Sequence, residues 1–196
     1  AHPIWNINGM SPEAGVDSTL YATPMVQLLK DAGYYTIHVG KAHWASTGTP
    51  GASPHNMGFC VNIAGSVNGM PRSYQSKDHY GNTPEKWNYL AVQNMAHWYD
   101  TDTHLTEALT VDALKTLDYP IENGIPFYLY MAHYSNHTPI QADDRFYQKY
   151  IDMGLDEGQA RYASMVEGMD KSLGDILDYL EDKGVADNTI IIFMTD

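Results

Sequence analysis

The stretch YYTIHVGKAHW, residues 34–44, decides the fold class. Its first six residues are aromatic or β-branched apart from His38, which is the composition of a strand, and Gly40 ends the run. Lys41 and His43 follow at once. In open α/β sheets ligands bind at the carboxyl ends of the strands. We therefore expect a strand over residues 34–39 that presents Lys41 and His43 at that edge of a sheet.

Three other parts of the chain have the apolar periodicity of helices. The expected helices cover residues 23–33, which Gly33 ends, residues 103–117, which stop near Pro120, and residues 158–183, which Gly184 ends. Each has one apolar stripe that must be buried against a neighbouring layer. These helices are the expected cover of the sheet.

Two more strands are expected at PFYLYMAH, residues 126–133, and TIIIFMTD, residues 189–196. Both are apolar on both faces, as strands in the middle of a covered parallel sheet are. Helices and strands in this order predict an α/β fold, a mostly parallel sheet flanked by helices. Residues 44–102 lack sustained periodicity and are interpreted as a long folded excursion within one domain that spans residues 1–196.

The composition excludes several classes of partner. With 11 Lys+Arg against 24 Asp+Glu the formal net charge is −13, which argues against a nucleic-acid or anionic-membrane surface. No apolar run is long enough to cross a bilayer. Cys60 has no second cysteine to pair with and reads as a packing residue more than as a nucleophile. A bound anion would therefore depend on a few local cations such as Lys41.

The polar candidates all fall at carboxyl ends of expected strands: Lys41 and His43, His137 in the loop after residues 126–133, and Asp196. Singly, such residues are also common in solvated loops. Together they suit transfer of a tetrahedral oxyanion group, because a lysine neutralises nonbridging oxygens, one histidine contacts the nucleophile, another protonates the leaving oxygen and a carboxylate holds a divalent ion. A nucleophile is missing from this set.

The remaining histidines give weaker signals. His38 is expected to face a packed sheet surface and to be structural, and His133 at a strand end is left open. The histidines at 55, 79, 97 and 104 lack a metal-ligand spacing, so a zinc site is not expected.

Three blocks closely resemble successive blocks of the type I sulfatases, of the alkaline phosphatase superfamily: LLKDAGYYTIHVGKAHW at 28–44, PFYLYMAHYSNHTPIQ at 126–141 and YASMVEGMDKSLGDILDYLEDKGVADNTIIIFMTD at 162–196. The resemblance implies an alkaline phosphatase-like core. It implies that Lys41 and His43 contact the sulfate and the catalytic formylglycine. It also implies that His137 binds sulfate and protonates the leaving oxygen, and that Asp196 ligates calcium.

The chain also departs from that family. The C-x-P-S-R motif whose cysteine or serine becomes formylglycine does not occur, nor do the usual N-terminal metal-binding aspartates, nor the asparagine that follows the residue corresponding to Asp196. The chain therefore resembles an internal, partial sulfatase catalytic domain, expected to be inactive alone. The resemblance further implies a calcium cofactor, formylglycine in the intact parent, a sulfated small molecule or glycan as substrate, and a periplasmic or secreted location. An exposed sheet edge makes self-association possible.

Two alternatives to a sulfuric ester hydrolase stay open. One is a sulfate-binding pseudoenzyme that has lost the nucleophile. The other is a related phosphodiesterase or phosphonate hydrolase, which shares the fold and the same edge of the sheet. The tyrosine, tryptophan and glycine content of residues 44–102 would suit a wall on which a carbohydrate stacks.

Overall fold

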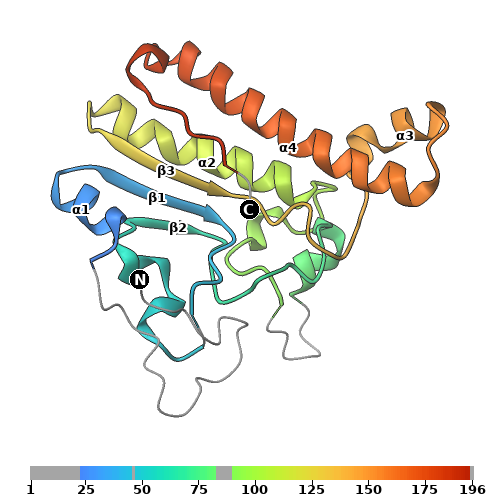
Figure 1. The fold of residues 1–196 in the computed structure, drawn as a ribbon, viewed down its shortest axis with the longest axis horizontal. Helices are drawn as coiled ribbons and strands as arrows, with labels where there is room; N and C mark the ends of the chain where they lie inside the picture. The colour runs from blue at the N-terminus through green and yellow to red at the C-terminus, as the bar shows by residue number, and fades with distance from the viewer. Residues whose placement is uncertain (1–22, 46, 83–89, 195–196) are drawn as a thin grey trace.

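A computed structural model describes residues 23–45, 47–82 and 90–194 (Figure 1). Its helices and strands are α1 (Met25–Asp31), β1 (Tyr35–Gly40), β2 (Val61–Ile63), α2 (Leu105–Glu122), β3 (Phe127–Ala132), α3 (Asp144–Asp152) and α4 (Glu157–Asp182). Short 3-10 turns occur at η1 (Pro50–Ala52), η2 (Pro54–Met57), η3 (Ser76–Gly81), η4 (Ala96–Trp98) and η5 (Ala186–Asn188).

The strands form a parallel sheet in the order β2-β1-β3. Ile37 in the central strand lies opposite Val61 on one side and Leu129 on the other. Because the strands are parallel, the loops that follow β1 and β3 leave the sheet at the same edge. The expected strands at residues 34–39 and 126–133 are confirmed.

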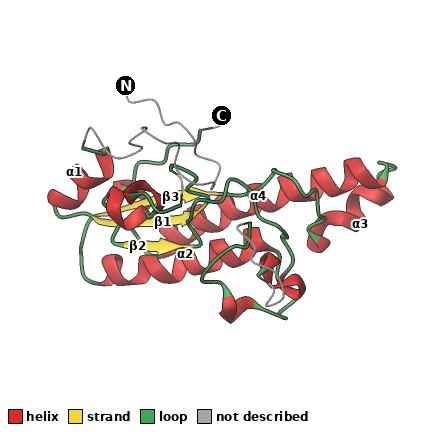
Figure 2. Ribbon diagram, turned by 90° about the horizontal axis from the view of Figure 1, so that it is seen from below, coloured by secondary structure: helices red, strands yellow, loops and turns green. Residues whose placement is uncertain are grey.

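Helix α2 packs against β1 and β3, and α4 packs on α2. Figure 2 shows the sheet nearly edge-on, with α1 on one side and α2 on the other. The core between sheet and helices includes Ile37, Val39, Leu109 and Met165, all fully buried. Their burial is the main favourable contribution to folding and fixes α2 across the sheet. The prediction of a mostly parallel sheet flanked by helices is confirmed.

The described part of the strand expected at residues 189–196, residues 189–194, does not form a strand. Within its described part, Ile190, Phe193 and Met194 are 88%, 77% and 82% exposed, and residues 189–194 carry no strand assignment. A strand exists only when a neighbour accepts and donates its backbone hydrogen bonds, and none of the described strands pairs with this segment. Apolar composition was therefore a misleading signal here. Asp196 lies outside the described residues.

The expected stop of the second helix near Pro120 holds to within two residues, although α2 includes Pro120 and ends at Glu122. A proline costs a helix most in its interior, where it removes a hydrogen bond and crowds the preceding turn. Pro120 lies two residues before the helix end and is buried, and its carbonyl still accepts from the Ile125 N–H at 2.8 Å. Helix α4 matches its expected range closely and ends before Gly184, whose φ is +70°.

The excursion at residues 44–102 contains β2, which has only three residues and no sequence signal of its own. The excursion also contributes the buried residues Tyr74, Tyr80, Val92 and Met95 to the hydrophobic core that contains the sheet residues. Helix α3 was not predicted either. None of the described helices is long and apolar enough to span a membrane.

Candidate active site

Lys41 leaves the sheet at a point where β1 and β3 are unusually close. Gly40 has a φ of +94°, and a Cβ at this position would lie 2.0 Å from the Ala132 carbonyl oxygen. Only glycine tolerates both constraints. The Lys41 N–H then donates to the same carbonyl at 2.7 Å. The ends of β1 and β3 are thereby joined, and the half-buried Lys41 lies at the edge where both strands end.

His43 is held by the loop of residues 64–70, which follows β2. Its backbone adopts a left-handed φ of +53°, and its N–H donates to the Ser66 carbonyl at 3.0 Å. Its ring lies directly against Gly69, where an added Cβ would come within 2.4 Å of the imidazole Cε1. The His43 ring can therefore occupy its observed position because residue 69 has no side chain.

His137 lies in the turn that follows β3, and its side chain is exposed. Its N–H donates to the Tyr134 carbonyl at 3.1 Å. Its Nδ1 lies 3.2 Å from both the carbonyl oxygen and the Oγ1 of Thr138. The contacts within the described chain therefore engage Nδ1 and leave Nε2 available to a ligand.

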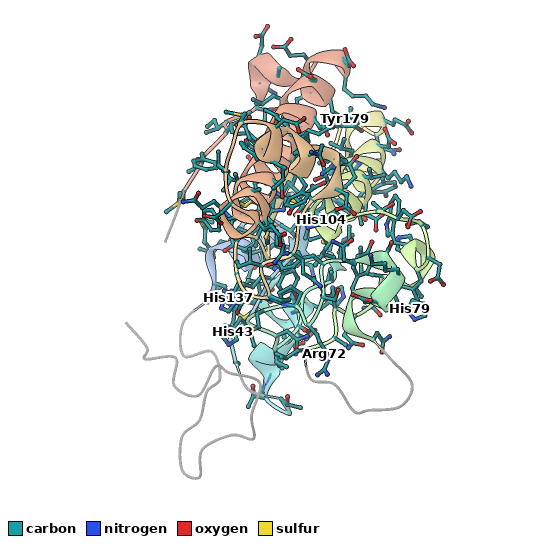
Figure 3. All side chains as sticks on the ribbon, turned by 90° about the vertical axis from the view of Figure 1, so that its right-hand side faces the viewer. His43, Arg72, His79, His104, His137 and Tyr179 are labelled. Carbon is teal, nitrogen blue, oxygen red and sulfur yellow. The ribbon has the colours of Figure 1, made fainter. Side chains whose placement is uncertain are left out.

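The side chains of these three residues meet at one edge of the sheet. Figure 3 shows His43 and His137 side by side. The pKa of His43 is lowered, first by burial and then by the positive charges of Lys41 and His137. His43 is therefore biased towards the neutral imidazole, which can accept a hydrogen bond, while Lys41 supplies fixed positive charge. The structure thus brings together Lys41, His43 and His137 as the sequence predicted.

The loop of residues 64–70 is a part of the site that sequence reasoning missed. Beyond its contacts with His43, Met70 Sδ lies 3.7 Å from the Thr138 hydroxyl, and the Ala64 carbonyl accepts from the Tyr134 hydroxyl at 2.9 Å. The loop therefore bridges the two histidine-bearing segments. The Asn68-Gly69 pair signals a turn, but nothing in the sequence tells which histidine that turn contacts.

His38 has the structural role expected of it. Its buried ring contacts Asn62 Oδ1 through Nδ1 at 3.1 Å and the Lys41 carbonyl through Nε2 at 3.3 Å. Burial lowers the pKa of His38 to about 4, against smaller raising effects of its Asn62 and Lys41 hydrogen bonds. The ring therefore lies between β2 and the backbone of Lys41, and in its neutral form it donates its one N–H to one of these two oxygens.

Cys60 lies at the opposite end of the sheet from Lys41. Its Sγ is 3.4 Å from the hydroxyl of Thr36, near the start of β1. At about 3.3 Å per strand residue, Thr36 is on the order of 15 Å from Lys41. This position fits the predicted packing role and excludes direct attack on a group held at Lys41.

The metal ligand inferred from the family resemblance, Asp196, lies outside the described residues. Within residues 23–45, 47–82 and 90–194, no three His, Cys, Asp or Glu side chains gather in a group that fits a metal ion. The described donor set alone does not fit a calcium site.

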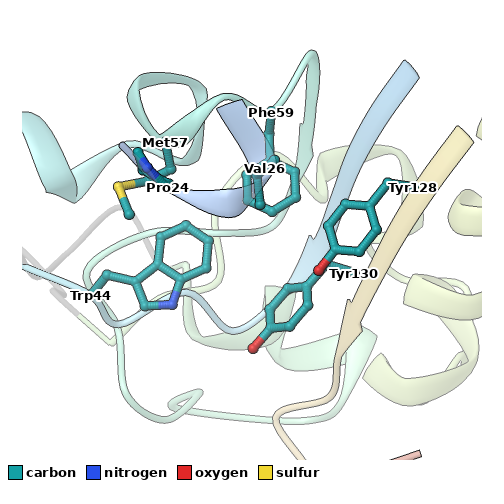
Figure 4. A pocket seen from close by; sticks show the side chains of 7 residues that line it. All are labelled: Pro24, Val26, Trp44, Met57, Phe59, Tyr128 and Tyr130. Atoms are coloured by element: carbon teal, nitrogen blue, oxygen red, sulfur yellow. The ribbon is translucent and has the colours of Figure 1, made fainter. Parts of the chain in front are cut away.

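A separate apolar pocket lies on the sheet face away from α2 and is shown in Figure 4. Its walls are Pro24, Val26, Trp44, Met57, Phe59, Tyr128 and Tyr130. Trp44 and Phe59 stack with ring centroids 5.8 Å apart. The cavity of about 90 Å³ is smaller than the few hundred Å³ of typical ligand pockets. The polar edge, and not this pocket, is the candidate active site.

Comparisons with known proteins show which family this chain belongs to. The family described as Sulfatase matches residues 5–196. Mouse arylsulfatase J is 30% identical over 175 residues, covering 87% of this chain and 28% of that protein. Human N-acetylgalactosamine-6-sulfatase is 30% identical over 178 residues, covering 87% of this chain and 31% of that protein. The chain thus spans about a third of the length of these curated relatives.

Solved structures share the fold. The crystal structure of Ps i-CgsB superimposes with a TM-score of 0.68 at 22% identity, covering 92% of this chain and 41% of that one. Its complex with k-i-k-neocarrahexaose gives a TM-score of 0.63 at 24% identity, covering 88% of this chain and 39% of that one. At this level of identity the likeness bears on the arrangement of strands and helices.

Proposed function

The chain belongs to the sulfatase family, and from this premise we propose that the protein is a sulfuric ester hydrolase whose active-site edge includes Lys41, His43 and His137. The observation that carries the proposal is the convergence of these three side chains where two parallel strands end. That set of groups suits a sulfate ester, whose charge must be neutralised while its ester oxygen leaves.

Each side chain then has a distinct task. Lys41 lies beside the nonbridging sulfate oxygens and offsets their negative charge. The His43 ring, held against Gly69, contacts the group that attacks sulfur. The S–O bond to the alcohol breaks, and the departing oxygen takes the proton of the His137 imidazolium, whose Nε2 is available. The net reaction consumes one water and yields an alcohol and sulfate.

The family nucleophile is formylglycine, and no C-x-P-S-R motif occurs in these 196 residues. The proposed activity therefore concerns the protein with that segment in place. Membership of the family implies a metal as well. We propose calcium with Asp196 among its ligands, where it would hold the sulfate and the nucleophile; calcium titration of the full-length protein with and without Asp196→Asn tests this by calorimetry.

We further propose a sulfated carbohydrate as substrate. The supporting observations are a relative named for a sulfated sugar, N-acetylgalactosamine-6-sulfatase, and a structural neighbour solved with a neocarrahexaose. Such a substrate would meet the protein in the periplasm or outside the cell, and we propose that location.

The test of the proposed function compares Lys41→Ala with Lys77→Ala in the full-length protein. Lys77 is an exposed cation in η3 and serves as the matched control. Removing one preorganised charge-stabilising group typically costs about 10²–10³-fold in rate. We expect that loss on a sulfated monosaccharide for Lys41→Ala and near wild-type rates for Lys77→Ala.

Assays of the same full-length protein also distinguish two alternatives to a sulfuric ester hydrolase. Faster turnover of phosphate esters than of the matched sulfate esters would identify a phosphoesterase. Sulfate binding that depends on Lys41, without turnover of any ester by a protein carrying the C-x-P-S-R segment, would identify a binding protein. Equal effects of the Lys41 and Lys77 substitutions would contradict the assignment of Lys41.

A further inference from the structure

Tyr74 lies at the junction of the excursion with the turn that carries His137. Its side chain is fully buried, although it comes from a segment without regular periodicity. Its hydroxyl is 2.7 Å from the Tyr134 carbonyl oxygen and 3.0 Å from the His137 carbonyl oxygen. These two carbonyls belong to the two ends of the turn in which the His137 N–H donates to Tyr134. One hydroxyl therefore contacts both ends of that turn.

Tyr74 is itself held from three directions. Its ring stacks on His104, with centroids 5.3 Å apart and planes 6° from parallel. Its N–H donates to Gln141 Oε1 at 2.6 Å, and its carbonyl accepts from the Leu105 N–H at 2.8 Å. Because His104 caps α2 and Gln141 follows the His137 turn in the chain, the hydroxyl is placed by elements on both sides of the turn.

The Tyr74 hydroxyl satisfies a carbonyl that water does not easily reach. It forms a buried hydrogen bond with the Tyr134 carbonyl, and removing this donor leaves that oxygen, at the start of the His137 turn, with one hydrogen bond fewer. A turn in that condition can relax by rotating its peptide groups. His137 would rotate with them, since its side chain is anchored mainly to the adjacent Thr138.

We propose that Tyr74 is a positioning residue for His137: its hydroxyl fixes the backbone turn that directs the imidazole Nε2 towards the leaving oxygen. This rests on the proposed function, because it assigns Tyr74 a role only if His137 donates a proton there. Tyr74 touches no reacting atom. It acts through the orientation of His137, and misplacing a catalytic group by about 1 Å can cost about 100-fold in rate.

The test is Tyr74→Phe in the full-length protein, with Tyr80→Phe as the matched control. Tyr80 is equally buried in the same excursion, and its hydroxyl also donates to a backbone carbonyl, that of Thr103 at 3.0 Å. The measured quantity is the ratio of two rates on one preparation: hydrolysis of p-nitrophenyl sulfate, whose leaving group needs little acid assistance, and of a sulfated monosaccharide, which needs much.

We expect Tyr74→Phe to raise this ratio about 10-fold in favour of the aryl sulfate and Tyr80→Phe to leave it at the wild-type value. The ratio is independent of the fraction of protein that is folded, so loss of stability alone does not change it. In a His137→Ala background, Tyr74→Phe should change the ratio no further, as for two groups that act through one contact.

Two results would overturn the proposal, and they differ in what else they imply. If His137→Ala raises the ratio but Tyr74→Phe does not, Tyr74 is only structural and the acid role of His137 stands. If His137→Ala leaves the ratio unchanged, the acid role fails and the positioning role of Tyr74 fails with it. A Tyr74→Phe effect that persists undiminished in the His137→Ala background also contradicts the proposal.

Discussion

His43 and His137 illustrate how two residues of one type acquire different properties from their neighbours. The half-buried His43 ring is flanked by Lys41 and packed on Gly69, and these surroundings lower its pKa. His137 is exposed, and its Nδ1 contacts Thr138. Burial disfavours the charged imidazole. At the residue scale burial and the neighbouring charges therefore favour His43 as a hydrogen-bond acceptor, while the contact of the His137 Nδ1 with Thr138 leaves the His137 Nε2 available to a ligand.

The first prediction concerns His137. In the full-length protein, His137→Ala should slow hydrolysis of sugar sulfates about 10²–10⁴-fold, the usual contribution of general acid catalysis, and slow activated aryl sulfates much less. The reason is that an alkoxide needs a proton on departure and a phenoxide hardly does. Rates across a series of leaving-group pKa values check this. A uniform loss across the series, with the fold intact by circular dichroism, would leave His137 as a sulfate-binding or structural residue.

The second prediction concerns Gly69. An alanine there would place its Cβ 2.4 Å from the His43 imidazole, so the ring must move. We expect Gly69→Ala to lower kcat on sulfate esters by at least about 10-fold while the melting temperature changes little. Gly174→Ala in α4 is the control, because an added Cβ there meets nothing within 4 Å. Unchanged kcat for Gly69→Ala would show that the observed His43 position is not required.

At the scale of elements, the buried residues His38 and His104 join segments of this fold. His38 links β2 to the end of β1. His104 caps α2, with its Nδ1 3.7 Å from Asp143 at the start of α3, and His133 follows β3. Burial lowers the pKa of each to about 4; for His104 the charge of Asp143 opposes this, and for His133 the charge of His104 adds to it. His38 and His104 therefore join these elements as neutral imidazoles, whereas the His133 Nδ1 has no hydrogen-bond partner among the described residues.

The third prediction follows from those pKa values. An unfolded chain binds protons at these histidines near pH 6.5, while the folded chain resists doing so until about pH 4. Stability present above pH 6.5 is therefore lost as the pH falls towards 4, by at most about 1.4 kcal/mol per pH unit for each histidine. Urea unfolding between pH 7.5 and 4.5 measures the slope.

A matched pair of variants identifies the source of this slope. His133→Gln should reduce it relative to the wild type, and His79→Gln at a partly exposed position serves as the comparison variant. A slope that is identical in the wild type and in His133→Gln would assign the acid sensitivity to other groups.

At the scale of the whole molecule, the surface of this chain combines a net charge of −13 with an uncovered apolar segment. Residues 190–194 expose Ile190, Ile192, Phe193 and Met194 at 76–88%. Contiguous exposed apolar residues mark association sites in soluble proteins. The repulsion between acidic molecules opposes such contacts, and salt weakens that repulsion.

The fourth prediction is that this 196-residue chain self-associates, and more strongly at higher salt. Sedimentation velocity at two protein concentrations and two ionic strengths measures this. Ile192→Lys should lower the association, whereas Met153→Lys, at an equally apolar but isolated exposed position after α3, should not. A single monomeric species under all four conditions would contradict the prediction.

The sequence by itself was sufficient for the parallel strands at 34–39 and 126–133, for α4 and for the convergence of Lys41, His43 and His137, because buried strands and amphipathic helices follow local composition and periodicity. It was insufficient where a structure depends on distant partners. The segment at 189–194 has the composition of a strand but pairs with none of the described strands.

Only the tertiary structure decided which residues support the site. Gly69 against the His43 ring and the Tyr74 hydroxyl between two carbonyls of the His137 turn are contacts across 26 and 63 positions of the chain. Both come from an excursion without periodicity. Which residues come into contact across such distances depends on how the whole core packs and not on their neighbours in sequence. A local sequence pattern therefore does not predict these contacts.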